Sequence, residues 1–518
     1  MSMRYGNSEN SVKLLIKATI LAGCIVVIGK LLGASWKASL AMAIFIFTVF
    51  LLITEAFSRA ASAFIGSALM LILIYFSGVY DLAEFASHTV HLDVILALLG
   101  VMLVAAAGLK SGFLYYVGIK IAKISRGDPI RLYAILAIFA YALSFALNCE
   151  AGIAVVVSLT LAICGVLRMD PRPYVLMEIF IINVSASTTL IAGIPNIIVA
   201  EEIGLPYEFF IVNLTPLTVI LFLISLLMLY TYIPPQREIH PLVAAAILDM
   251  DEWLFVRNRF EFYASLVSIV GLVIGFIALR ELMFVSILFS AIILVASPKT
   301  EELLHEVDWD TILFFLGFYI IVGGLEHTGV LDLIAHSLLS FAGNDVFILL
   351  SAIFWLSLLV SGFLDNVPYI ITVLPIVQIL VSQPPFSKYE SLFWIALIFA
   401  CNIGGGLNPY SSPYNLLGLS MAKKANAEIT SDMFYGVSRK WTICSGTLAY
   451  IYLLLRLFAG EIIEILSLIG FVATLTIIIV VALLIGIRKA MGLRRFFLES
   501  KAFGALIKGI VKKKLKRR

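Results

Sequence analysis

Charged side chains are scarce in this chain of 518 residues. Asp, Glu, Lys and Arg together make up 13% of the sequence, whereas hydrophobic residues make up 62%. Soluble globular proteins contain about 25% charged residues, so this composition excludes a soluble globular protein. Apolar runs of about 20 residues recur along the chain, and each is long enough to cross a hydrocarbon core about 30 Å thick. The sequence therefore predicts an all-α polytopic membrane protein.

Cysteine and histidine are also rare, and neither is clustered. The five cysteines are scattered through apolar runs without a Cys-x-x-Cys pair, and the six histidines fall near predicted span ends. A metal centre and a disulfide framework therefore have little support. No Gly-x-Ser-x-Gly motif is present either. We expect no enzyme activity, no cofactor and no nucleic-acid partner.

Basic residues are unevenly distributed. Twelve of the 36 Lys and Arg residues lie between Arg488 and Arg518, interleaved with Phe and Leu. This pattern is typical of an amphipathic segment on an anionic lipid leaflet; the alternative is a solvated tail that only fixes orientation. Because basic segments stay in the cytoplasm, we expect an integral plasma (inner) membrane protein with both termini cytoplasmic.

The sequence resembles itself at an offset of 217 residues. At this offset DVILALLG (93–100) aligns with DTILFFLG (310–317). When the offset is increased by two residues, Asn183 aligns with Asn402. Matches of Asp, Asn and Gly in one register indicate two copies of one unit. The predicted organisation is an N-terminal three-helix segment (1–91), a first repeat (92–233), a cytoplasmic linker with two helices (234–308), a second repeat (309–458), and a last helix with the basic amphipathic cytoplasmic tail (459–518).

Equivalent loops of the two copies carry different charge. Residues 110–131 contain five bases, whereas their counterpart, 327–347, contains none. Later in the unit the bias reverses, because 201–210 has three acids and no base while 423–440 has four bases. Since basic loops stay cytoplasmic, equivalent loops are predicted to lie on opposite faces of the membrane. Inverted repeats of this kind are typical of secondary transporters.

Two segments are predicted to be re-entrant hairpins. Residues 131–167 and 347–382 are each long enough for two short spans, but the flanking charges place both ends of each on one side. Their tips lie near Cys149 and Asp365. Irregular backbone at membrane depth is tolerated only where it lines a cavity, and a carboxylate there is a functional candidate. Glu150 and Asp365 are therefore the candidate titrating carboxylates. The tips also contain the amide and turn residues Asn148, Asn366 and Pro368.

Each copy also contains a helix interrupted by small residues and proline. NVSASTTLIAGIPNIIVAEE begins at Asn183, and NIGGGLNPYSSPYNLLGLS begins at Asn402. Unwound backbone frees carbonyl oxygens for a small cation and half-helix N-termini for an anion. The structural alternative is close helix packing by small residues. Four hydroxyls add oxygen ligands that suit sodium: Thr188, Thr189, Ser411 and Ser412.

These motifs resemble the ion transporter superfamily. FLDNVP, VDWDTILFFLGFYIIVGGLEHTGVL (307–331) and TTLIAGIPNIIVAEEIGL (188–205) are similar to its branch of arsenite permeases, the melanosomal P protein and NhaD-type sodium/proton antiporters. The likeness covers residues 90–440. It implies an elevator-type fold, usually a homodimer, with a scaffold domain and a mobile transport domain that holds the hairpins and broken helices.

The resemblance also implies a set of ion- or substrate-binding residues. They are Asp365, Asn366 and Pro368 in the second hairpin; Thr188, Thr189, Gly193, Pro195 and Asn196 in the first broken helix; and Asn402, Asn408, Pro409, Ser411, Ser412 and Asn415 in the second. The first hairpin departs from the family pattern, which commonly has Asn at the place of Cys149. This chain has Asn148-Cys149-Glu150 there.

We therefore expect a secondary active ion transporter, coupled to protons or sodium by alternating access, that works as an ion antiporter or exports an oxyanion. The alternative is a sodium-coupled symporter of citrate or another di- or tricarboxylate. The lack of Lys and Arg in the hairpin tips and breaks argues against that alternative. A passive channel is disfavoured by the matched inverted hairpins. Sodium, where it couples transport, is predicted at Asn148, Thr188, Asn366 and Ser411.

Overall fold

The computed structural model describes residues 8–459, except for 32, 55, 80, 127, 236–250, 254–255, 257 and 280. Within these ranges the chain is helical and contains no β-strand. Eight of the described helices are long and apolar enough to cross a membrane. The predicted all-α polytopic membrane fold is thereby confirmed. Apart from Ala459, the predicted last helix and basic tail (459–518) lie outside the described residues.

The helices fall into two length classes. Those that contain a span-length apolar stretch are α1 (Ser8–Leu31), α2 (Trp36–Ile53), α3 (Arg59–Phe76), α5 (Leu92–Lys110), α12 (Thr215–Tyr232), α14 (Arg259–Leu279), α17 (Trp309–His327) and α23 (Ser431–Ala459). The others are α4 (Leu82–Thr89), α6 (Phe113–Ile124), α7 (Pro129–Ala146), α8 (Cys149–Leu167), α9 (Arg172–Ser185), α10 (Ile194–Ile203), α11 (Tyr207–Asn213), α15 (Leu282–Ala296), α16 (Thr300–Glu306), α18 (Val330–Ala342), α19 (Val346–Ser361), α20 (Asn366–Val381), the 3-10 turn η1 (Phe386–Tyr389), α21 (Glu390–Gly404) and α22 (Pro413–Lys424).

The segments of the two predicted repeats contain the same succession of helices. A long helix (α5 or α17) and a shorter one (α6 or α18) precede a helical hairpin, which is α7–α8 in one segment and α19–α20 in the other. Two half-helices separated by a break follow, α9 and α10 or α21 and α22. A hairpin and a broken helix therefore occur at each predicted place. That the hairpins enter and leave the membrane on one side stays a prediction.

Side-chain capping explains where the second helix of each hairpin begins. Asn148 accepts a hydrogen bond from the backbone N–H of Ala151 over 3.0 Å, and Asp365 accepts one from that of Val367, also over 3.0 Å. Asn and Asp are favoured caps because their side-chain oxygens satisfy N–H groups that lack a partner within the helix. The structurally equivalent tip residues are thus Asn148 and Asp365, one neutral and one acidic.

Proline determines where the broken helices resume. Pro195 occupies the first turn of α10 and Pro413 begins α22, positions where the missing N–H costs no helical hydrogen bond. Pro368 likewise lies in the first turn of α20, and Pro409 is buried within the second break. The rings of these prolines carry no polar group and offer no side-chain ligand. Their role is to set the backbone path around the site.

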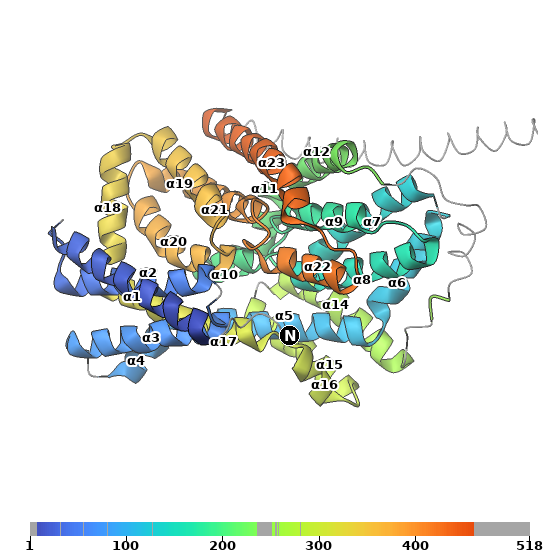
Figure 1. The fold of residues 1–518 in the computed structure, drawn as a ribbon, viewed down its shortest axis with the longest axis horizontal. Coiled ribbons are helices and arrows are strands. Elements are labelled where there is room, and N and C mark those ends of the chain that lie inside the picture. Colours follow the sequence, from blue (N-terminus) through green and yellow to red (C-terminus); the bar gives the residue numbers. More distant parts are fainter. Residues whose placement is uncertain are drawn as a thin grey trace, which may run out of the picture. The chain divides into compact units, whose positions relative to one another are not determined.

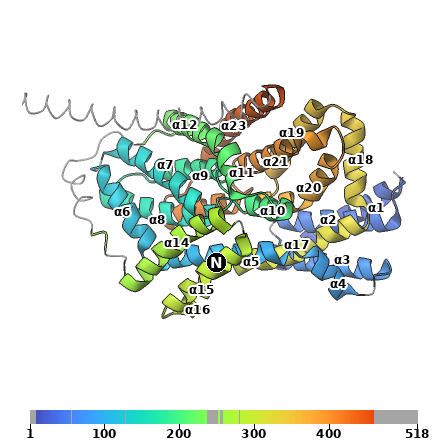
Figure 2. The same ribbon diagram turned by 180° about the vertical axis from the view of Figure 1, so that it is seen from behind.

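The two repeat segments are interlocked. α10 packs against α20, the second helix of the other segment's hairpin, and α22 packs against α8 in the same crossed manner. Figure 1 shows both pairs side by side, and Figure 2 shows α10 beside α20 from behind. Outside them, α3 packs against α17, and α15 packs against α5. A site between the hairpin tips and the breaks is therefore built from both segments.

Candidate functional site

Four asparagines join the two broken helices. Asn183, near the end of α9, donates from Nδ2 to Oδ1 of Asn415 over 2.8 Å. Asn402, near the end of α21, donates from Nδ2 to Oδ1 of Asn196 over 3.1 Å. All four side chains are fully buried. Each half-helix end is thus hydrogen-bonded to the half-helix start of the other segment.

Asn196 and Asn415 also hold the unwound backbone of their own segments. Asn196 donates from Nδ2 to the carbonyl oxygens of Ala186 and Thr189, over 2.7 Å in both cases. The equivalent acceptors for Asn415 are the carbonyl oxygens of Gly405 and Asn408, at 2.7 and 3.2 Å. These bonds add donors to carbonyl groups that lie in the helix breaks, where the regular helical hydrogen bonds are interrupted.

This network leaves two oxygens without a partner. Because Asn196 and Asn415 use their amide nitrogens on carbonyl groups, their oxygens must face the donors of Asn402 and Asn183, which fixes the orientation of all four amides. The remaining oxygens, Oδ1 of Asn183 and Oδ1 of Asn402, are buried and accept no hydrogen bond. Such an acceptor costs about 1–3 kcal/mol, and oxygens are the ligands that hard cations prefer.

Both oxygens lie beside the unwound backbone of the opposite segment. A Cβ atom added to Gly405 would lie 3.3 Å from Asn183 Oδ1, and one added to Gly193 would lie 3.4 Å from Asn402 Oδ1. The Cβ at Gly193 would also come within 2.8 Å of the Ala186 carbonyl oxygen, closer than van der Waals contact allows. Glycine at position 193 is therefore required by the close approach of the Ala186 carbonyl group within the same break.

The predicted hydroxyl ligands are buried and mostly hydrogen-bonded to the protein. Thr189 donates to the carbonyl oxygen of Phe145 over 3.2 Å, and the Thr188 hydroxyl lies 3.5 Å from that of Tyr141. Ser411 donates to carbonyl oxygens of its own break, each at 2.7 Å. Ser412 precedes α22 and is fully buried. A hydroxyl that donates keeps lone pairs for a cation, so the sodium ligand set stays a prediction.

The hairpin tips lie against the breaks. The backbone N–H of Cys149 donates to the carbonyl oxygen of Ala192 over 2.9 Å. At the other tip, Asn366 Nδ2 lies 3.5 Å from the hydroxyl of Tyr414, and Oδ1 of Asn366 is buried without a hydrogen-bond partner. Among the four residues predicted to bind sodium, Asn366 is therefore the one with a buried side-chain oxygen that neither donates nor accepts a hydrogen bond.

The two predicted carboxylates interact electrostatically with the same charged neighbours. Glu150, in the first turn of α8, has a buried oxygen, Oε2, that accepts no hydrogen bond. Its charge interacts with those of Asp308, Asp365 and Arg59. Asp365 in turn forms an ion pair with Arg59, whose Nη2 lies 2.8 Å from Oδ2. The tips of both hairpins and the starts of α3 and α17 therefore share one cluster.

Two residues of the site, Arg59 and Asn183, are absent from the set of ligands predicted from the sequence. Arg59 begins the apolar helix α3, and a lone base at a span end is explained by membrane orientation without any site. Nothing in the sequence connects it to Asp365, more than 300 residues away. Asn183 did carry a signal, because it aligns with Asn402 between the two repeats.

A second ion pair joins α5 to α10. Nδ1 of His91, the residue before α5, lies 2.9 Å from Oε1 of Glu202. The hydrogen bond to Glu202 raises the pKa of His91 above its ordinary value, and the charges of Glu202, Asp93 and Glu326 add to this, whereas burial acts in the opposite direction. The His91 ring also packs against that of Tyr319, with centroids 5.1 Å apart.

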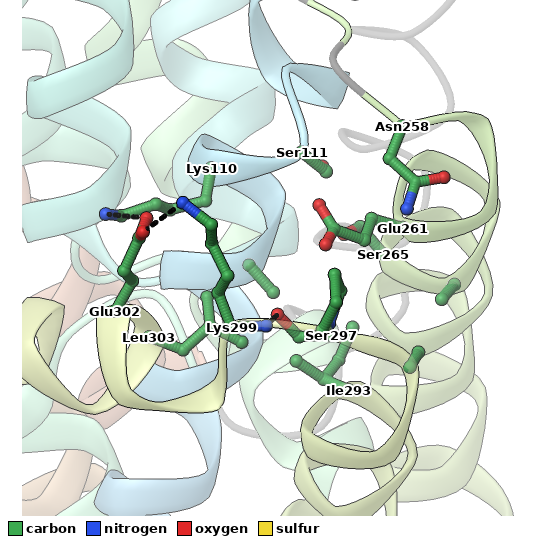
Figure 3. A pocket seen from close by; sticks show the side chains of 14 residues that line it. Lys110, Ser111, Asn258, Glu261, Ser265, Ile293, Ser297, Lys299, Glu302 and Leu303 are labelled. Atoms are coloured by element: carbon green, nitrogen blue, oxygen red, sulfur yellow. Dashed lines mark hydrogen bonds and ion pairs between the residues drawn. The ribbon is translucent and has the colours of Figure 1, made fainter.

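A cavity of about 200 Å³ lies at the far end of α5 from His91. It is lined by parts of α5, α14 and α15 and by the turn into α16. Figure 3 shows Lys110 and Lys299 converging on Glu302, where their Nζ atoms lie 3.5 and 2.6 Å from its carboxylate oxygens. No residue of the hairpin tips or breaks lines this cavity, so it is separate from the site described above.

Comparisons with known proteins agree with this architecture. Residues 49–394 match the family described as "Citrate transporter". An uncharacterized transporter of Mycobacterium tuberculosis (strain H37Rv) is 30% identical over 425 residues, covering 81% of this chain and 98% of that protein. The 46 kDa membrane protein of Mycobacterium leprae is 29% identical over 427 residues, covering 80% and 98%.

A more distant relative supports the wider grouping. The P protein of Homo sapiens is 21% identical over 487 residues, covering 78% of this chain and 58% of that protein. The resemblance to the ion transporter superfamily is thereby confirmed. Since the family match spans well over half of the sequence, the chain belongs to the citrate transporter family of membrane transporters.

Proposed function

We propose that this membrane transporter is a secondary active ion transporter, coupled to protons or sodium, that binds its coupling ion between the hairpin tips and the broken helices. The observation that carries the proposal is the pair of buried, unpartnered oxygens on Asn183 and Asn402. They occur at equivalent places in the two segments and face unwound backbone. A cation there would supply the missing electrostatic partner.

The carboxylates supply a means of coupling. Glu150 and Asp365 belong to one cluster at the two tips. A cation binds the charged form of a carboxylate, whereas a proton removes that charge, so the two compete for the same group. Competition of this kind is sufficient for an antiporter: a proton arriving on one side of the membrane expels the cation there.

Sodium-coupled symport of citrate or another di- or tricarboxylate is a second candidate, favoured by a specific observation. Although the tips and breaks contain no base of their own, the structure brings Arg59 to the tip of the second hairpin. The N-termini of the half-helices α10 and α22 lie at the breaks, where their dipoles favour an anion. The description of the matching family adds to this support.

The movement that exposes the site remains part of the proposal. Alternating access in an elevator would move the hairpins and broken helices as one body against α3, α5, α15 and α17. A homodimer would hold the scaffold still, and the basic C-terminal segment would contact cytoplasmic lipid. Location in the plasma (inner) membrane and cytoplasmic termini complete the proposed arrangement.

Reconstitution into liposomes tests the function. The purified full-length chain is sealed with a pH-sensitive dye inside, and gradients of sodium, arsenite or citrate are imposed in turn. A sodium gradient that drives proton movement supports antiport; citrate uptake that requires sodium supports the second candidate. Replacing Asn402 by Leu should weaken the sodium dependence, while Ser265→Ala in the separate cavity should not. If no gradient drives any flux in the unmodified protein, the proposal is wrong.

A further inference from the structure

The ion pair between Arg59 and Asp365 connects two parts of the molecule that an elevator would move apart. Arg59 is the first residue of α3, which packs against α17 and α2. Asp365 caps α20 at the tip of the second hairpin. Their side chains are 30% and 14% exposed, respectively, so solvent screens this pair less than it screens a surface pair.

The neighbouring acids are engaged in holding the starts of helices. Asp308 caps α17 by accepting hydrogen bonds from the backbone and hydroxyl of Thr311. Asp310 accepts a hydrogen bond from the backbone N–H of Ala60 over 3.3 Å, which fixes the start of α3 beside α17. The start of α3, which carries Arg59, is therefore held in place beside α17. Within the described residues, Arg59 is the base that forms an ion pair with Asp365.

Arg59 occupies the place on Asp365 that a coupling ion needs. Oδ1 of Asp365 accepts the capping N–H of Val367, and Oδ2 faces the guanidinium at 2.8 Å. A guanidinium stays protonated in proteins, so it cannot leave by losing its charge. A second cation that binds the carboxylate competes with the guanidinium and weakens the pair.

We propose that Arg59 is a tethered counter-ion that holds the empty second hairpin against α3, and that a sodium ion bound to Asp365 releases it. The inference rests on the proposed function, because it requires Asp365 to take the coupling ion. With the pair intact, the empty transporter is held in place; with the ion bound, the hairpin moves. Arg59 thus acts as a positioning residue that links ion binding to movement.

Sodium affinity measured by thermal stabilisation tests the proposal. The full-length protein in detergent is titrated with sodium chloride, with choline chloride as the ionic-strength control. Arg59→Gln removes the competitor, so the sodium concentration for half-maximal stabilisation should fall by about tenfold, the change that corresponds to about 1.4 kcal/mol. Arg59→Lys keeps a charge but loses the planar fork, and should give a smaller fall. In the Asp365→Asn background, Arg59→Gln should have no further effect.

Lys110→Gln is the matched control. It breaks the ion pairs of Lys110 with Glu302 and Glu306, at a side chain 32% exposed, as partly exposed as Arg59, but outside the ion site. Its sodium midpoint should equal that of the unmodified protein. A merely structural role for Arg59 would lower the unfolding temperature without sodium and leave the midpoint unchanged.

Transport gives a second readout. In liposomes, Arg59→Gln should increase the sodium flux that occurs without proton exchange, because the empty transporter can cross. The inference is overturned by one combination of results. Sodium stabilises the unmodified protein, but both Arg59 variants have the same sodium concentration for half-maximal stabilisation and the same sodium flux without proton exchange as the unmodified protein. Should Arg59→Gln fail to fold, the Arg59→Lys midpoint decides alone. If sodium and protons have no effect even on the unmodified protein, the proposed function fails first, and the inference fails with it.

Discussion

Asn183 donates its side-chain amide to Oδ1 of Asn415 over 2.8 Å, across the boundary between the two repeat segments. Its counterpart, Asn402, makes the same bond to Asn196 over 3.1 Å. Asn196 and Asn415 of the second half-helices thereby brace the ends of the first half-helices. The braced residues, Asn183 and Asn402, carry the unpartnered oxygens. The same four amides therefore belong both to the hydrogen-bond network that holds the breaks together and to the proposed ion site.

Replacing Asn415 by Leu should destabilise the protein. The substitution leaves the carbonyl oxygens of Gly405 and Asn408 and the amide of Asn183 without Asn415 as a partner. Each of these groups keeps one other partner, but every lost hydrogen bond still costs about 0.5–1.5 kcal/mol. The unfolding temperature in detergent should therefore fall, while Asn344→Ala on an exposed turn should leave it unchanged. Equal unfolding temperatures for the two variants would mean that the amide bracing contributes nothing.

Much of this architecture follows from local sequence signals. The hairpin expected over 131–167 corresponds to α7 and α8, and the one over 347–382 to α19 and α20. Asn, Asp and Pro mark these tips and breaks because each acts on its own few residues of backbone, through capping or a missing N–H. Such local effects can be predicted from the sequence without knowledge of the fold.

The remaining features depend on tertiary packing. The pairing of Asn183 with Asn415, rather than with a residue of its own segment, results from the crossed packing of the half-helices. Glu150 and Asp365 also occupy different places in their hairpins: the residue equivalent to Asp365 is Asn148, as the shared capping role shows. By residue type alone, Glu150 and Asp365 would be equivalent acids at the two tips. Their backbone positions show that they are not equivalent.

The inverted topology can be tested by cysteine labelling. Lys120 in α6 and His336 in α18 occupy corresponding helices, and both are exposed. If the repeats are inverted, single cysteines at these positions react with membrane-impermeant reagents from opposite sides of the membrane. The five natural cysteines are first replaced, and transport of that background is checked. Labelling of both positions from the same side would contradict the inverted repeat.

The His91–Glu202 pair should make stability depend on pH. Because the pKa of His91 in the folded protein is raised above 6.5, the pair contributes fully below pH 6.5 and its contribution is lost as pH rises through the raised value. As pH rises above about 6.5, the unfolding temperature should therefore fall more steeply in the unmodified protein than in His91→Gln. Glu202→Gln should flatten the profile less than His91→Gln, since the charges of Asp93 and Glu326 still raise the pKa of His91. A steep profile in both variants would assign the pH dependence to other groups.

Asp365→Asn separates the two roles of the second hairpin tip. The substitution keeps the side-chain oxygen that caps α20 through the N–H of Val367, as Asn148 already does for α8, so the variant should fold and insert. It removes the charge that attracts a cation and the group that takes a proton. Ion-gradient-driven transport should therefore be lost, and the pH dependence of any residual rate should flatten.

Glu150→Gln provides the comparison for that experiment. Glu150 lies in the same cluster, but its Oε2 has no hydrogen-bond partner and it caps no helix, so its loss removes one charge without disturbing the tip. Transport rates for the unmodified protein and both variants are measured across the pH range used for His91. We expect a similar or milder defect than in Asp365→Asn. If Asp365→Asn instead retains the rate and the pH profile of the unmodified protein, Asp365 serves only as a helix cap, and the coupling carboxylate must be sought at Glu150.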